Sequence, residues 1–124
     1  MNVSTTTRDG VQSYARKRLR TSLDFPRIAA AARADALAVC QTLLPSGRRY
    51  GNEYVALNPR RADTKLGSFK VAVSGQRAGC WCDFATGDSG GDLISLVAYL
   101  HDLRQGEAAR RLATILHLDA EVRP

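Results

Sequence analysis

Apolar residues recur at steps of three and four positions between Asp24 and Leu44, which is the spacing of one face of an α-helix. Asp24 is a good helix N-cap and Pro26 suits the first turn, whereas Pro45–Gly47 cannot continue a helix. The pattern therefore predicts one helix over residues 24–44. The apolar positions of its expected buried stripe are Phe25, Ile28, Ala32, Ala36, Val39, Cys40 and Leu43.

Two more helices are expected in the C-terminal part of the chain. One begins near Asp92, whose carboxylate can accept from backbone N–H groups of the first turn, and its apolar stripe continues to Leu100. Asp102–Gly106 ends that helix, and the last helix is expected at Glu107–His117.

Alternation of apolar and polar residues predicts short strands between these helices. Phe69–Val73 follows a period of two, and Cys80–Phe84 forms a second strand that the small, turn-forming residues of Ala85–Gly91 cannot continue. Upstream, Arg48–Leu57 is typical of a hairpin whose turn is Gly51-Asn52, because both residues tolerate a positive φ.

Together these elements predict an α+β fold in which a small antiparallel sheet of about four strands packs against about three to four helices. We expect residues 1–8 to be disordered and residues 9–124 to form a single domain. That domain comprises a helical N-terminal part (9–44), which includes a basic helix at Asp9–Thr21, and a core (48–117).

Composition indicates the cellular compartment in which the protein is expected. No apolar run is long enough to span a membrane, and the N-terminus lacks the apolar core of a secretory signal. Three cysteines are an odd number without the spacing of a disulfide framework, as is usual in a reducing compartment. These features predict a cytoplasmic protein without a membrane partner.

Charge is distributed unevenly along the chain. Residues 1–77 carry 14 Lys and Arg against 5 Asp and Glu, a net charge of +9, while residues 78–124 carry 4 against 7, a net charge of −3. Such asymmetry favours a basic face of the kind that nucleic-acid-binding proteins use. The alternative from charge alone is a solvated basic surface that keeps the protein soluble.

Four segments carry a likeness to a known family. They are Tyr54–Arg61, Gly67–Val71, Asp83–Thr86 and Gly90–Ile94, the last containing Gly-Gly-Asp before an apolar helix. In order and spacing they resemble the small zinc-binding domain of bacterial-type DNA primases, especially that of phage and plasmid replication proteins. The resemblance covers roughly residues 48–117 and implies a zinc-ribbon-like fold and a role in priming DNA replication.

The positions that bind zinc in that family hold Asn58, Arg61, Asp83 and Thr86 here. Arginine stays protonated, and Asn and Thr are poor substitutes for thiolate or imidazole, so we expect no metal at this place. An ion pair between Arg61 and Asp83, with Asn58 and Thr86 hydrogen-bonded around it, is expected to hold the two turns together instead.

The loop Asn58–Gly67 is rich in guanidinium groups and is the leading candidate for phosphate contacts. Aromatic rings beside cations on an exposed sheet face would stack unpaired bases. One face must cover the helices, however, and we expect Phe69 and Phe84 to lie in the core. The residues predicted to contact nucleic acid are Arg48, Arg49, Tyr50, Tyr54, Arg60, Arg61, Lys65, Lys70, Arg77 and Trp81.

Cys80 and Cys82 would point to the same side of a strand and, with Cys40 and His101, would make four metal ligands. Their spacing matches no zinc signature, so we favour two small hydrophobes on the core face with Trp81 opposite. No Ser, His and Asp set and no cluster of magnesium-binding carboxylates is present, which predicts neither catalysis nor a cofactor.

Two functions remain open. The first is a non-catalytic module that binds single-stranded DNA template in a mobile-element replication system and assists a primase, polymerase or helicase. The second is a protein-interaction module that recruits or regulates a replication partner without binding nucleic acid.

Overall fold

The computed structural model of the chain describes residues 22–122, so the predictions for residues 1–8 and for Asp9–Thr21 lie outside the described part. Residues 22–122 form an α+β fold, as predicted, with four helices and one antiparallel sheet. The helices are α1 (Phe25–Ala34), α2 (Ala36–Leu43), α3 (Leu93–His101) and α4 (Gln105–Ile115). The strands are β1 (Arg48–Tyr50), β2 (Glu53–Ala56), β3 (Phe69–Ala72), β4 (Trp81–Asp83) and β5 (Ser89–Gly90).

The single helix predicted over residues 24–44 is two helices in the structure. Asp24 caps α1 as expected, since its carboxylate accepts from the backbone N–H of Arg27 at 3.2 Å. The helix stops at Asp35, where φ is −125° and the backbone N–H donates to the Ala32 carbonyl. On either side of the break, α1 buries Ile28 and Ala32, and α2 buries Ala36, Val39 and Cys40.

The strands follow one another in the sheet in the order of the chain, β1-β2-β3-β4-β5, with every neighbouring pair antiparallel. The predicted hairpin is present, with Gly51 in its turn at a φ of +60°. Strand β4 ends at Asp83, before Ala85–Gly91, as predicted, but Ser89–Gly90 within that segment form a fifth strand, β5, that the sequence does not predict. Gly90 lies so close to the Trp81 ring that a Cβ on it would be 2.4 Å from Trp81 Nε1.

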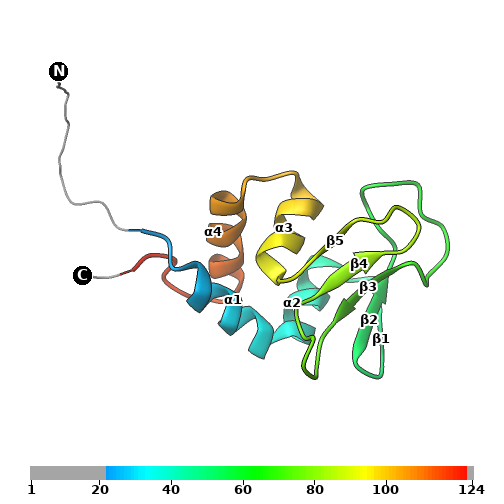
Figure 1. Cartoon of the computed structure of the whole chain (residues 1–124), viewed down its shortest axis with the longest axis horizontal. Helices are drawn as coiled ribbons and strands as arrows, with labels where there is room; N and C mark the ends of the chain where they lie inside the picture. Colours follow the sequence, from blue (N-terminus) through cyan, green and yellow to red (C-terminus); the bar gives the residue numbers. More distant parts are fainter. Residues whose placement is uncertain (1–21, 123–124) are drawn as a thin grey trace, which may run out of the picture.

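Helices cover one face of the sheet, and the opposite face is turned away from them (Figure 1). The core between the two layers contains the rings of Phe69 and Trp81, whose centroids are 6.3 Å apart in an edge-on arrangement. Tyr99 from α3 packs on both rings, at 4.7 Å from Trp81 and 6.3 Å from Phe69. Helix α3 thus anchors the helical layer to strands β3 and β4.

Helix α3 begins at its predicted cap, since the Asp92 carboxylate accepts from the Ser95 backbone N–H at 2.8 Å. It ends at Asp102, which adopts a left-handed conformation with a φ of +55°. Helix α4 follows at Gln105, slightly earlier than predicted, and buries Leu112 between alanines against the core.

Candidate nucleic-acid interface

The register of the sheet separates its side chains into two sets. On the helix-covered side, which we call the core face, Tyr54, Val71 and Trp81 lie opposite one another on adjacent strands. On the other side, the outer face, the corresponding row contains Val55, Lys70 and Cys82. The remaining members of the outer face are Arg48, Tyr50, Glu53, Ala72, Cys80, Phe84 and Ser89.

Two aromatic residues predicted to contact nucleic acid belong to the core face instead. Tyr54 is 2% exposed and Trp81 is 5% exposed. Their polar atoms are also occupied, because the Tyr54 hydroxyl donates to the Leu44 carbonyl at 2.6 Å and Trp81 Nε1 donates to Ser95 Oγ at 3.0 Å. Both side chains are therefore parts of the core, and the prediction that they stack bases is wrong.

Phe84 was predicted to be a core residue and is instead exposed. It follows β4 on the outer face and is 72% exposed. The Lys70 ammonium lies over its ring, 5.6 Å from the centroid. Tyr50 is 57% exposed on β1, as a base-stacking residue would need to be. The exposed rings of the outer face are thus Tyr50 and Phe84.

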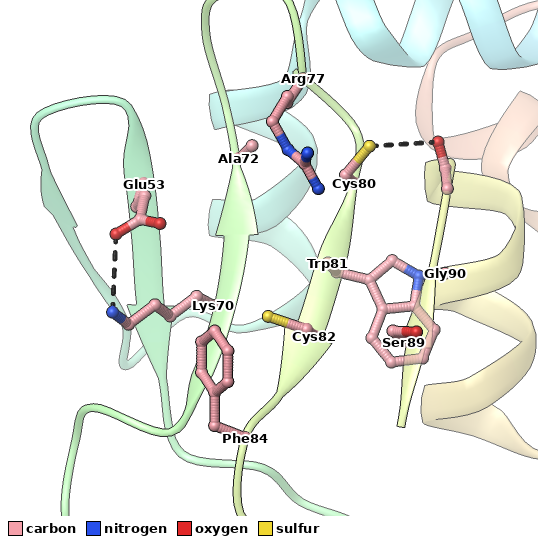
Figure 2. A pocket seen from close by; sticks show the side chains of 11 residues that line it. Glu53, Lys70, Ala72, Arg77, Cys80, Trp81, Cys82, Phe84, Ser89 and Gly90 are labelled. Carbon is pink, nitrogen blue, oxygen red and sulfur yellow. Dashed lines mark hydrogen bonds and ion pairs between the residues drawn. The ribbon is translucent and has the colours of Figure 1, made fainter. Parts of the chain in front are cut away.

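The cysteines of β4 also occupy the face opposite to the predicted one. Cys80 and Cys82 are half-buried on the outer face, whereas Trp81 between them fills the core (Figure 2). The thiol of Cys80 is within 3.8 Å of the Gly91 carbonyl. Cys40 is buried, as predicted, and burial raises the pKa of its thiol to about 12. Within residues 22–122, no group of three or more His, Cys, Asp or Glu side chains is placed to hold a metal ion.

The ion pair predicted from the sequence is present at the end of the sheet. Arg61 approaches Asp83 with two donors, Nε at 2.7 Å from Oδ2 and Nη2 at 3.1 Å from Oδ1. The Asp83 side chain is fully buried and that of Arg61 is 25% exposed. Arg61 also contacts Asp63, with Nη2 at 3.2 Å from Oδ2. Two parallel donors to one carboxylate fix the position of both side chains.

Asn58 extends this cluster toward helix α3. Its Nδ2 donates to Asp83 Oδ2 and to the Tyr99 hydroxyl, each at 2.8 Å, and the Tyr99 hydroxyl donates to Asp88 Oδ2 at 2.8 Å. Thr86 bonds the Asp83 backbone and not its carboxylate: Thr86 Oγ1 donates to the Asp83 carbonyl at 3.5 Å, and the Thr86 backbone N–H donates to the same carbonyl at 3.2 Å. We call Asn58, Arg61, Asp83 and Tyr99 the ion-pair cluster. It connects the loop after β2, the end of β4 and α3.

The cluster holds Asp83 ionised. The Arg61 guanidinium lowers the pKa of the Asp83 carboxyl to about 2, and hydrogen bonds from Asn58 and the Ala85 backbone N–H act in the same direction against burial. The same pairing raises the pKa of Arg61. Buried charges require this kind of compensation, since removing a carboxylate from water without a partner is costly.

The loop between β2 and β3 is less available to phosphate than predicted. Arg61 is used by the ion-pair cluster, and Arg60 lies over the Tyr99 ring, 5.4 Å from its centroid, with Nη1 donating to the Tyr99 carbonyl at 3.1 Å. Arg60 Nη1 is also 3.7 Å from Asp102 Oδ1. Lys65 is exposed. Two of the three loop cations therefore tie the loop to the rest of the fold.

Other predicted cations lie on or beside the outer face. Arg48 and Arg77 are exposed, and Lys70 is half-buried with Nζ 3.7 Å from Glu53 Oε1. Arg49 bends back to the hairpin, where Nε donates to the Gly51 carbonyl at 2.8 Å and Nη2 lies 3.4 Å from Ser74 Oγ. Arg48, Lys70 and Arg77 are consequently the cations best placed to meet a ligand on this face.

Fold and surface together define a class: a small α+β protein with an open antiparallel sheet that presents exposed rings and cations on its outer face. No family model matches the chain, and comparison with curated protein sequences finds no match either. Among the helices of residues 22–122, none combines the length and apolarity needed to cross a membrane.

Proposed function

We propose that this chain is a non-catalytic module that binds single-stranded DNA across the outer face of its sheet. One observation carries the proposal: on a face that the described helices leave open, the exposed rings of Tyr50 and Phe84 lie among the cations Arg48, Lys70 and Arg77. Aromatic rings stack unpaired bases, and Lys and Arg contact the phosphates between them. A short sheet with this combination suits a flexible single strand better than a rigid duplex.

We further propose that the module acts beside a primase, polymerase or helicase during replication of a mobile element. The resemblance of residues 48–117 to the zinc-binding domain of DNA primases supports this setting. Three members of the ion-pair cluster, Asn58, Arg61 and Asp83, stand at zinc-ligand positions in that resemblance, and charge and hydrogen bonds join them. Nucleotide transfer would then be carried out by the partner protein.

The test is fluorescence anisotropy with a labelled single-stranded oligonucleotide at two salt concentrations, beside a duplex of equal length. We expect preferential binding of the single strand that weakens as salt rises, because phosphate contacts release counterions. Replacing Arg48, Lys70 and Arg77 with Ala should lower the slope of log affinity against log salt by about 2, at about 0.7 per contact. A triple alanine variant of Arg104, Arg110 and Arg111 is the matched control, since it removes the same charge far from the outer face.

Equal loss of affinity in both triple variants would assign binding to net charge and would contradict an interface on the outer face. Absence of single-strand binding at low salt would overturn the proposal and favour a protein-interaction module that uses the same face. That alternative predicts association with a replication protein that changes little with salt and is weakened by Phe84→Ala.

A further inference from the structure

The outer face is hollowed between the end of the β1–β2 hairpin and strand β5. The hollow has a volume of about 440 Å³, within the range of about 300 to 1,000 Å³ typical of small-ligand sites. Figure 2 shows Lys70 in the hollow with Glu53 on one side and Phe84 on the other. The hollow is also lined by Ala72, Arg77, Cys80, Trp81, Cys82 and residues 89–91.

The Lys70 ammonium lies near both the Glu53 carboxylate and the Phe84 ring. Its Nζ is 3.7 Å from Glu53 Oε1 and 5.6 Å from the centroid of the Phe84 ring. The Glu53 side chain is 51% exposed, and among residues 22–122 it is the one carboxylate that lines the hollow. One wall therefore offers a ring for stacking, and the adjoining edge offers an ammonium donor beside a carboxylate acceptor.

We propose that this hollow is a base-reading subsite that prefers guanine, an inference that rests on the proposed single-strand binding. The base stacks on Phe84, and its Watson–Crick edge faces Lys70 and Glu53. Guanine presents along that edge a carbonyl oxygen, then a ring N–H, then an amino group. Lys70 donates to the carbonyl O6, and the two oxygens of Glu53 accept from the adjacent N–H groups.

The other bases match this order of donors and acceptors less well. Thymine has a single ring N–H between two carbonyl oxygens, so one oxygen of the Glu53 carboxylate would meet an acceptor. Cytosine and adenine each place an amino donor where Lys70 also donates, and a ring nitrogen acceptor where Glu53 also accepts. Glu53 is therefore the specificity-determining residue of the subsite, and Phe84 provides affinity without selecting a base.

The experiment compares strands of about nine nucleotides that are all thymine except for the central base, which is thymine, guanine or inosine. Inosine differs from guanine only by lacking the amino group. Because the Glu53 side chain is half exposed, we expect guanine to bind about fivefold tighter than thymine. Inosine should fall between the two. Glu53→Gln should remove the preference, so that the strands with central guanine and central thymine bind this variant with equal affinity.

Equal affinities for the three strands, with salt-dependent binding of the all-thymine strand retained, would overturn guanine selection and leave single-strand binding intact. Absence of binding to every strand at low salt would overturn both. A guanine preference that persists in Glu53→Gln would contradict the role of this carboxylate. Circular dichroism of the variant checks its fold, and the inosine comparison in the unmodified protein tests the amino contact without any substitution.

Discussion

Trp81 and Phe84 lie close together in sequence, but they lie on opposite faces of the same sheet. They differ in exposure and in the groups that they contact. Trp81 is 5% exposed, packs on Phe69 and Tyr99, and donates to Ser95. Phe84 is 72% exposed and meets mainly the Lys70 ammonium. The comparison teaches that the face of the sheet decides whether an aromatic ring of this chain packs in the core, as Trp81 does, or stays exposed, as Phe84 does. Four substitutions or conditions can break or sharpen that division.

The largest effect is expected from Trp81→Ala. Removing a fully packed tryptophan leaves a cavity between the sheet and α3, and such changes cost about 3 to 5 kcal/mol of unfolding free energy. Urea denaturation followed by circular dichroism measures the loss. Phe84→Ala is the matched variant and should change the free energy of unfolding by about 0.5 kcal/mol or less. Similar losses for the two variants would contradict the assignment of the faces.

Arg61→Ala should cost about 3 kcal/mol of unfolding free energy, because Asp83 would remain buried without its cation. The control is the double variant Arg61→Ala with Asp83→Asn, which removes the uncompensated charge and should recover part of the loss. Thermal and urea unfolding of the three proteins tests this. An unchanged melting temperature in Arg61→Ala would show that the ion-pair cluster does not stabilise the fold.

Acid should weaken the protein through the same pair. The Arg61 guanidinium lowers the pKa of Asp83 to about 2 in the folded protein, from the ordinary value of 3.8 for an aspartate in an unfolded chain, so the folded state binds this proton less readily than the unfolded state. The stabilisation by ionised Asp83 is therefore complete above about pH 4 and is lost as the pH falls toward 2. Asp83→Asn should lower stability at neutral pH and flatten its decline between pH 4 and 2. An identical decline in both proteins would contradict the lowered pKa.

The smallest effect concerns binding rather than folding. Phe84→Ala should weaken single-strand binding by about 1 kcal/mol, the lower end of the range for one stacked base, since one side of the ring already meets Lys70. Anisotropy titration measures the affinity, and Phe84→Tyr is the control because it keeps a stacking ring. Unchanged affinity in Phe84→Ala would remove Phe84 from the interface even if the cations contribute.

Local chemistry determined much of the fold. Asp24 and Asp92 cap helices where predicted, because a carboxylate at that position satisfies backbone donors whatever surrounds it. Gly51 permits the hairpin turn for an equally local reason. The pair between Arg61 and Asp83 was also predictable, but only through the resemblance that aligned the two turns, since nothing in their spacing brings them together.

Tertiary structure decided which side chains of each strand face the core. It also decided that the helix predicted over residues 24–44 breaks into two. The period of two in β4 is compatible with Cys80 and Cys82 inside or with Trp81 inside, and the larger apolar surface of tryptophan favours its burial against α3. Phe84 continues the same alternation to the outer face. The chain breaks at Asp35 between α1 and α2, and both helices contribute buried residues to one core.

The candidate interface also depends partly on the sequence alone and partly on the tertiary structure. The sequence by itself determined the types of residue available, namely arginines and lysines interleaved with a few aromatics, and their order along the strands. Tertiary structure decided that Tyr54 and Trp81 belong to the core, that Arg60 and Arg61 are held by Tyr99 and Asp83, and that Tyr50, Phe84 and Lys70 remain at the surface. The physical reason is that burial and pairing depend on neighbours distant in sequence.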